Sequence, residues 1–289
     1  MIARRELPQL HLAWNREWGA PFGTRAHRGL RMLGSAGRRL DRYLFKIAPS
    51  LGGLFRFQEN NTTRRAEYPW AFYATPLSDG LKVLEIGGSL SGFQFVLDRA
   101  GCQVTNVDPG MKSHGLGWPV DQLHIHRLNR AFRTKVVLHN CFLHEAPLEP
   151  ASFDRVFSIS VIEHIPQAEV AGTIARVYEL LKPGGYFILT LDLFLNLAPF
   201  CSRESNEYGS NVSARLIAEA APFELNQGDR RELLGYPEFD RDHILSTLEA
   251  LMLGDYPALP QLMVLRKPTD ADQVRGDDPA DDVTSTTRS

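Results

Sequence analysis

Short apolar runs alternate with amphipathic segments along the middle of the chain. Five of these runs have the length and composition of buried strands, at residues 81–86, 102–107, 134–139, 153–160 and 186–194. Helices are predicted over residues 90–100, 121–132 and 167–181. Strands separated by helices of this length form a mostly parallel sheet with helices on both faces, so the pattern predicts a doubly wound α/β fold.

The two ends of the chain differ in composition from this central region. The formal net charge of -2 conceals an excess of positive charge in residues 1–65, which carry thirteen Lys and Arg against four acidic residues. Residues 269–289 are polar and acidic and contain no aromatic side chain. We therefore expect a basic N-terminal extension (1–66), a central domain (67–268) and a disordered acidic tail (269–289).

The spacing of the cysteines and the hydropathy of the chain indicate its cellular compartment. Cys102, Cys141 and Cys201 show no C-x-x-C spacing, which favours reduced thiols over a disulfide framework or a zinc site. No window approaches 18 uninterrupted apolar residues, and the first residues lack an apolar core of signal-peptide length. We expect a cytoplasmic protein without a transmembrane span.

A turn of small residues, LEIGGSLSG at 84–92, follows the first strand, so we expect a ligand close to its backbone. A phosphate-binding P-loop needs Lys followed by Ser or Thr after its last glycine, and Phe93-Gln94 stands there instead, which excludes that loop. The dinucleotide fingerprint G-x-G-x-x-G is matched only as Gly87-x-Ser89-x-x-Gly92, which is weak evidence.

Glu85 distinguishes a dinucleotide from S-adenosylmethionine. It lies two residues before Gly87, at the strand end that faces the ligand, where a carboxylate would repel a pyrophosphate by on the order of several kcal/mol. S-adenosylmethionine carries a sulfonium and an α-ammonium group and no phosphate, so the same acid favours it. Asp108 ends the second strand, where its carboxylate can accept hydrogen bonds from a ribose diol. The alternatives are an exposed charge at Glu85 and a turn-starting Asp108.

Four motifs in this order resemble those of the class I S-adenosylmethionine-dependent methyltransferases. They are Glu85-x-Gly87, Val107-Asp108-Pro109, FDRVFSISVIEHIP at 153–166 and ELLKPGGYFILTLD at 179–192. More narrowly, they are similar to the bacterial small-molecule group with a type-11 methyltransferase domain. The resemblance covers about residues 67–195, with weaker agreement to 268. It implies a seven-stranded, mostly parallel sheet whose last strand, 259–267 here, is antiparallel.

The chain departs from the family pattern at two places. Ser89 and Ser91 stand where later glycines are usual, and serine restricts φ more than glycine does. The Gly-Asp pair that follows the third strand in the family is absent, and Asn140 could supply an amide oxygen there instead. We expect the cofactor to be bound by Glu85, Gly87, Gly88, Ser89, Asp108, Asn140, Cys141 and Ser160.

The end of the fourth strand, Ser158–His164, is expected beside the reacting methyl group. Methyl transfer to a hydroxyl requires alignment and removal of a proton, so we predict His164 as the general base, with Glu163 assisting it or binding substrate. The open alternative is that both side chains only shape the turn into the next helix. The segment lacks the Asp/Asn-Pro-Pro-Tyr/Phe signature of base amino-methylases. Ser160 stands where related RNA enzymes carry a metal-binding Glu, so no metal site is expected.

Residues 60–77, NNTTRRAEYPWAFYATPL, precede the first strand and leave two interpretations open. Arg64, Arg65, Glu67, Tyr68 and Trp70 could close over the cofactor or the acceptor, or the aromatic residues could pack a helix onto the sheet.

We expect a methyltransferase that acts on a small-molecule or glycan/lipid-precursor acceptor at oxygen, with no nucleic-acid partner. The alternative is a non-catalytic or RNA-binding protein, built on a degenerate methyltransferase domain with a basic N-terminal arm. The clustered arginines of that arm could bind RNA or an anionic membrane surface.

Overall fold

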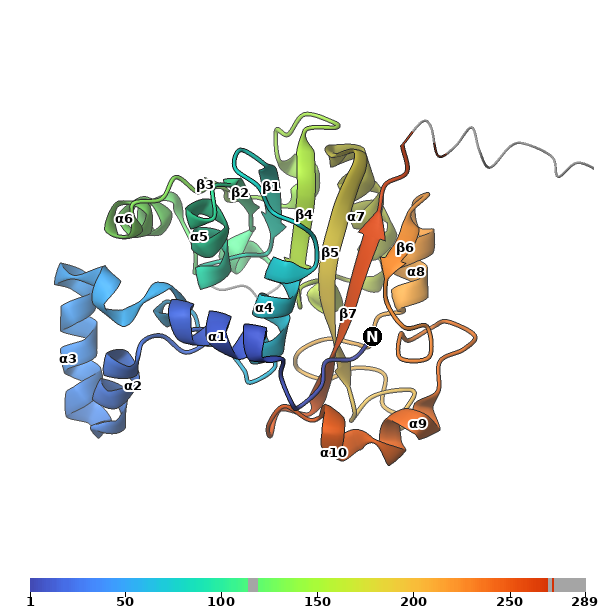
Figure 1. Cartoon of the computed structure of the whole chain (residues 1–289), viewed down its shortest axis with the longest axis horizontal. Helices are drawn as coiled ribbons and strands as arrows, with labels where there is room; N and C mark the ends of the chain where they lie inside the picture. The colour runs from blue at the N-terminus through green and yellow to red at the C-terminus, as the bar shows by residue number, and fades with distance from the viewer. Residues whose placement is uncertain (114–118, 270–271, 273–289) are drawn as a thin grey trace, which may run out of the picture.

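A seven-stranded sheet forms the centre of the molecule (Figure 1). The computed structural model describes residues 1–113, 119–269 and 272. The strand order is β3-β2-β1-β4-β5-β7-β6. The strands are β1 (Lys82–Ile86), β2 (Gln103–Val107), β3 (Val137–His139), β4 (Phe153–Ile159), β5 (Leu181–Phe194), β6 (Glu224–Gln227) and β7 (Ala258–Arg266). This order confirms the predicted doubly wound α/β fold.

Strand direction follows the prediction as well. β1 to β5 pair in parallel, whereas β7 lies antiparallel between β5 and β6. β7 pairs with β5 from Tyr186 opposite Arg266 to Phe194 opposite Ala258, which confirms the antiparallel closing strand. β6 was not predicted, because it is a four-residue edge strand whose side chains alternate between exposed and half-buried and form no apolar run.

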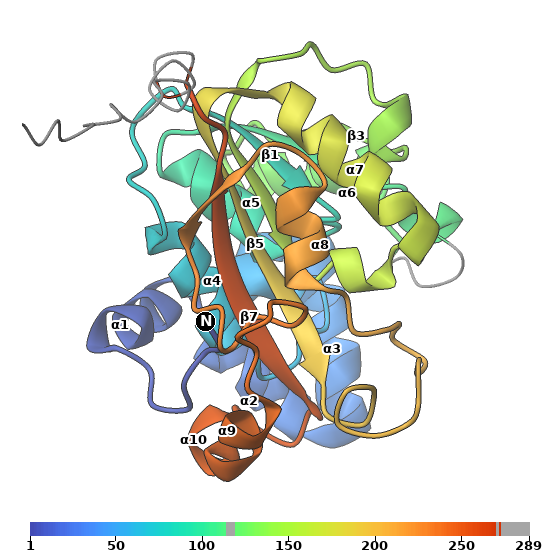
Figure 2. The same cartoon turned by 90° about the vertical axis from the view of Figure 1, so that its right-hand side faces the viewer.

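Helices cover both faces of the sheet. They are α1 (Gln9–Trp18), α2 (Arg25–Met32), α3 (Gly34–Ile47), α4 (Arg64–Tyr73), α5 (Gly92–Arg99), α6 (Gln122–Phe132), α7 (Gln167–Leu180), α8 (Ala214–Glu219), α9 (Arg241–Ser246) and α10 (Leu248–Leu251). Figure 2 shows α7 and α8 on one side of β7 and α1 and α4 on the other. None of the helices in the described residues is long and apolar enough to cross a bilayer.

Alternate residues of the strands face two separate cores. Val83 of β1 packs with side chains of α1, α4, α5 and α6, whereas its neighbour Leu84 packs with side chains of α7 and α8. Because side chains alternate along a strand, Glu85 follows Val83 onto the face that carries α4 and α5.

The N-terminal segment belongs to the first of these cores. A series of aromatic rings runs from α1 to the sheet, with centroid distances of 5.8 Å for Trp14–Phe55, 5.1 Å for Phe55–Tyr68, 5.6 Å for Tyr68–Phe93 and 5.3 Å for Phe93–Phe157. Ile2 also forms an antiparallel bridge with Gln261 of β7. Burial of large rings is a major source of packing energy, so this segment stabilises the central domain.

The division at residues 66 and 67 falls inside α4, and the domain boundaries stay a prediction. The predicted tail at 269–289 lies outside the described residues, apart from Thr269 and Asp272.

Gly92, the first residue of α5, shows how closely the N-terminal segment packs. A Cβ atom at this position would lie 2.6 Å from Cγ of Phe55. The small residue after the turn therefore makes room for a ring of the protein itself, where the sequence suggested a ligand.

We expect Gly92→Ala to lower the free energy of unfolding by about 1–3 kcal/mol, because the added methyl group overpacks the Phe55 ring. Thermal and denaturant unfolding measure the change. Gly172→Ala is the matched control, since nothing lies within 4 Å of a Cβ there and the residue is inside α7. It should stabilise the protein by about 0.5–1 kcal/mol. Equal effects of the two changes would contradict this account of Gly92.

Candidate functional site

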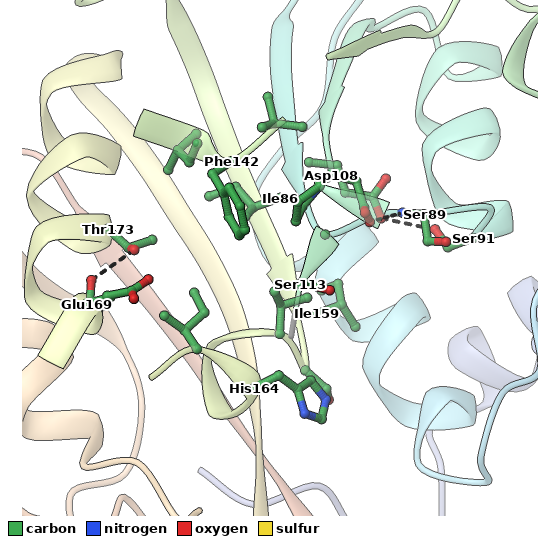
Figure 3. Close-up of a pocket in the computed structure, with 18 of the residues that line it drawn as sticks. Ile86, Ser89, Ser91, Asp108, Ser113, Phe142, Ile159, His164, Glu169 and Thr173 are labelled. Carbon is green, nitrogen blue, oxygen red and sulfur yellow. Dashed lines mark hydrogen bonds between the residues drawn. The ribbon is translucent and has the colours of Figure 1, made fainter. Parts of the chain in front are cut away.

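A cavity of about 470 Å³ lies where the carboxyl ends of β1, β2 and β4 meet (Figure 3). Ligands of doubly wound sheets bind at this edge, and the volume lies in the about 300–1,000 Å³ range of small-molecule pockets. Side chains of α4 and α7 complete the walls. The figure labels Asp108 and Ser89 on one side of the cavity, Thr173 and Glu169 on the opposite side, and His164 at its lower end.

The backbone amides of the turn after β1 are hydrogen-bonded within the protein. The Gly88 amide donates to Oδ1 of Asn106 at 3.2 Å, and the Ser89 amide donates to Oδ2 of Asp108 at 2.8 Å. The amides of Gly87 and Ser91 donate to backbone carbonyls. A pyrophosphate would need such N–H groups, and these four are occupied.

Ser89 adopts a left-handed backbone conformation, with φ of 43°. Nε2 of Gln94 donates to the Ser89 carbonyl at 2.9 Å, and Nδ2 of Asn106 donates to it at 3.2 Å. These bonds stabilise the strained residue, which is one of the two serines that stand where the family pattern has glycine. The substitution is therefore compatible with an intact turn.

Glu85 lies under this turn with almost no access to solvent. Its exposed fraction is 2%. Oε1 accepts a hydrogen bond from Oγ of Ser91 at 3.1 Å, whereas Oε2 has no partner among the described residues. Burial raises the pKa of Glu85 to about 8, and the negative charge of Asp108 adds to this rise. A buried carboxyl with an unpaired oxygen beside a cavity is a site for a cationic or hydrogen-donating ligand.

Asp108 closes the same wall. Its Oδ1 accepts from the Gly110 amide at 2.6 Å, in addition to the Ser89 contact of Oδ2. Burial raises the pKa of Asp108, while the two amide bonds oppose the rise. Each oxygen retains a second lone pair, so the carboxylate can still accept hydrogen bonds from a diol.

His164 lies in a short 3-10 turn, Ile162–His164, at the other end of the cavity. Its Nδ1 atom donates to the backbone carbonyl of Tyr208. Burial lowers the pKa of the ring below its usual 6.5. In the neutral ring with the proton on Nδ1, Nε2 carries a free lone pair and can accept a proton.

A buried polar network lies next to His164. Arg64 of α4 donates to the carboxylate of Glu67 and to Oγ of Ser160, at 2.5 Å for the serine. Ser160 and Thr190 also donate to Oε1 of Glu67. Burial opposes ionisation of Glu67, but Arg64 and these hydrogen bonds lower its pKa below the usual value.

Two further acids lie near this ion pair. Glu163 Oε1 accepts from the Asp192 amide at 2.9 Å, and its Oε2 has no partner in the described part of the chain. Burial raises the pKa of Glu163 to about 7 and that of Asp192 to about 8, and the mutual repulsion of the acids contributes to the rise in Asp192. The guanidinium of Arg64 thus lies near three buried acids, which are Glu67, Glu163 and Asp192. Within the described residues, no group of three or more His, Cys, Asp or Glu side chains is placed to hold a metal ion.

The cavity brings together six of the ten residues that the sequence analysis assigned to the site. These six are Glu85, Gly87, Ser89, Asp108, Ser160 and His164. Four assigned residues do not line it: Gly88, Asn140, Cys141 and Glu163. Nδ2 of Asn140 donates to the backbone carbonyl of Asp108 at 2.9 Å, so this residue supports Asp108 and leaves the cavity wall to Phe142 and Leu143.

Helix α7 supplies a wall that the sequence analysis missed. Glu169, Thr173 and Arg176 line the cavity, and they occupy the polar face of the helix at spacings of four and three residues. Thr173 Oγ1 donates to the Glu169 carbonyl at 3.0 Å (Figure 3). The signal was available in the sequence as a polar stripe beside the apolar face of Val170, Ile174 and Val177.

Helix α4 fits both interpretations left open by the sequence. Arg64 and Tyr68 line the cavity, whereas Trp70 is buried in the core formed with the sheet. Arg65 lies on another surface, where its carbonyl accepts from Nδ2 of Asn15.

Residues 84–189 match the family described as a methyltransferase domain, type 11. Over 113 residues the chain is 33% identical to phosphoethanolamine N-methyltransferase 2 of Caenorhabditis elegans, which is 39% of this chain and 24% of the relative. The chain thus spans about a quarter of that relative. The family match confirms, over residues 84–189, the predicted resemblance to the S-adenosylmethionine-dependent methyltransferases.

Solved structures of similar fold cover more of the chain. The cyclase SpnF is 16% identical with a TM-score of 0.50, over 80% of this chain and 95% of SpnF. The 1,6-didemethyltoxoflavin-N1-methyltransferase of Burkholderia thailandensis is 17% identical with a TM-score of 0.49, over 92% of this chain and 95% of that one. The first likeness supports the Rossmann-like fold.

Glu85→Gln should stabilise the protein increasingly as the pH rises. The pKa of Glu85 rises from 4.5 to about 8 on folding, so its contribution to stability is fully present below pH 4.5. That contribution is lost by about 1.4 kcal/mol per pH unit up to about pH 8. The glutamine variant avoids this loss. Its advantage in thermal unfolding should grow from pH 5 to pH 8 and then level off.

Glu249→Gln, at an exposed position of α10, is the matched control. Its offset from wild type should not change over the same pH range. A constant offset for Glu85→Gln as well would refute the buried, unpaired state of this carboxyl.

Proposed function

We propose that this chain, whose residues 84–189 belong to the type-11 methyltransferase domain family, transfers the methyl group of S-adenosylmethionine to a hydroxyl of a small-molecule acceptor. The observation that carries the proposal is the unpaired, buried carboxyl oxygen of Glu85, beneath a turn whose amides are already bonded. This arrangement suits a cationic nucleoside and disfavours a diphosphate.

The residues present fit the cofactor. Glu85 would balance the positive charge of the methionine part, and Asp108 would accept hydrogen bonds from the ribose hydroxyls. The apolar side chains of Phe142, Leu143 and Pro109, which line the same cavity, would enclose the adenine ring. When bound, the cofactor supplies an electrophilic methyl group on a sulfonium.

His164 would act on the acceptor. A hydroxyl is a poor nucleophile until its proton is removed, and the neutral imidazole offers Nε2 for that proton while the Tyr208 carbonyl holds Nδ1–H in place. Burial keeps the ring neutral at physiological pH. Ser160 would complete this end of the cavity through its bonds to Arg64 and Glu67.

The polar face of α7 would bind the acceptor. Glu169, Thr173 and Arg176 provide an acid, a hydroxyl and a guanidinium on one wall. Such a wall suits a polar small molecule or a glycan or lipid precursor. The C. elegans relative is named for transfer to nitrogen, and a neutral amine needs no base, so the role of His164 distinguishes oxygen from nitrogen as the methylated atom.

Titration calorimetry with S-adenosylmethionine tests the cofactor site. Wild type should bind, and Glu85→Gln or Asp108→Ala should weaken binding about tenfold or more, since each removes one charged hydrogen bond. Glu169→Gln is the control from the opposite wall and should bind the cofactor like wild type. Absence of binding by wild type would favour the non-catalytic alternative, and binding of NAD instead would overturn the assignment.

Methyl transfer is measured by incubating the protein and methyl-labelled cofactor with a metabolite extract and finding the labelled product by mass spectrometry. His164→Gln should lower kcat by about 10²–10⁴-fold and leave cofactor affinity unchanged. Because burial lowers the pKa of His164 below 6.5, wild-type kcat should fall only at pH values below 6.5. A labelled N-methyl product whose rate is unaffected by His164→Gln would exclude the oxygen proposal.

A further inference from the structure

Helices α2 and α3 form a hairpin at the end of the molecule remote from β6 and β7 (Figure 1). α2 contacts α3 and a short 3-10 helix, Pro49–Gly52, and none of the hairpin residues lines the cavity described above. The hairpin is therefore not part of the wall of the proposed cofactor cavity.

The hairpin exposes large apolar side chains. Leu40, Tyr43 and Ile47 are 46%, 61% and 62% exposed and follow one side of α3 at spacings of three and four residues. Fifteen large hydrophobic residues are exposed in the described part of the chain, and six of them fall within residues 32–51. Those six are Met32, Leu33, Leu40, Tyr43, Ile47 and Leu51. Such a concentration marks an interaction surface.

Arginines surround these apolar side chains. Arg25, Arg28, Arg38, Arg39 and Arg42 are exposed, and no ion pair is found for them within the described residues. The only acid of residues 25–47 is Asp41, and it is buried. Its carboxylate contacts Nδ1 of His27 at 2.8 Å and Nη2 of Arg56 at 3.1 Å, so it leaves the surface charge unbalanced.

The hairpin is held in one arrangement. A Cβ atom on Gly37 of α3 would lie 1.8 Å from the carbonyl oxygen of Leu30 of α2, so the two helices meet closely at this glycine. The buried contacts of Asp41 join both helices to Arg56. The apolar and basic side chains are thus presented together by a packed element.

We infer that this surface, the basic apolar face of α2 and α3, binds the surface of an anionic lipid bilayer. Aliphatic side chains can enter the acyl boundary while long arginine side chains reach lipid phosphates. RNA fits less well, because five of the six apolar side chains are aliphatic and only Tyr43 can stack on a base. A symmetric contact with a second copy of the chain would bring these five arginines close to those of the other copy.

Co-sedimentation with vesicles tests the inference, using phosphatidylcholine alone and an equal mixture with phosphatidylglycerol. The full chain should bind the mixed vesicles and fail to bind the neutral ones. Arg38→Glu with Arg42→Glu should weaken binding by at least about 25-fold, since each arginine near an anionic surface contributes about fivefold. Leu40→Asp with Ile47→Asp should abolish the binding that remains at high salt.

Leu216→Asp on α8 and Arg241→Glu on α9 are the matched controls, because both residues are exposed and lie outside the hairpin. They should bind vesicles like wild type, and thermal unfolding should show that all variants are folded. Absence of binding to the mixed vesicles would overturn the inference. So would binding that is insensitive to Leu40→Asp with Ile47→Asp, or tighter binding to a single-stranded RNA oligomer that competes with the vesicles.

Discussion

The hydrogen bonds from the turn after β1 to two side chains at the end of β2, Asn106 and Asp108, determine what the cavity can bind. Because Asn106 and Asp108 hold the amides of Gly88 and Ser89, these N–H groups do not face a ligand. The carboxyl of Glu85 lies beneath these amides. When it is ionised, it makes the local electrostatic potential negative. When it is protonated, it leaves a buried hydrogen-bond donor and acceptor without partners. The ionised state favours a cationic nucleoside over a diphosphate, and in both states the bonded amides are withheld from a diphosphate of the kind this turn binds in other doubly wound sheets.

The N-terminal segment supports this site from outside the strand and helix alternation. The rings of Trp14, Phe55 and Tyr68 continue the core up to Phe93 of α5, and Gly92 at the start of α5 leaves space for Phe55. The helix that carries Tyr68 also carries Arg64 to the cavity. The N-terminal segment therefore packs against both the start of α5 and the helix that carries Arg64 to the cavity.

The features that could be predicted from the sequence are the strands, which are long apolar runs, and the side chains that lie at strand ends. Such apolar runs form β1, β2, β4, β5 and β7. Because Glu85 and Asp108 lie at the ends of two of these strands, their position at the cavity could be predicted. Asn140 was assigned on the same basis, but its side chain turns back to the Asp108 carbonyl, a choice that depends on tertiary contacts. Glu163 was assigned from its neighbour His164, and the tight 3-10 turn sends the two side chains to different surroundings. The excess of arginine in residues 1–65 indicated that the basic segment could bind a partner, but which apolar side chains accompany the arginines on the α2–α3 surface depends on exposure in the fold.

The acids beside His164 explain why a histidine can remain a base in this place. An ionised Asp192 would stabilise the imidazolium and raise the pKa of the ring. Burial and the negative charges of Glu163 and Glu67 raise the pKa of Asp192 to about 8 instead, so Asp192 keeps its proton near neutral pH. Glu67 is the acid that takes up the charge of Arg64. The guanidinium of Arg64 thus neutralises Glu67, burial together with repulsion from Glu163 and Glu67 keeps Asp192 protonated, and the ring that faces the acceptor in the proposed reaction stays uncharged.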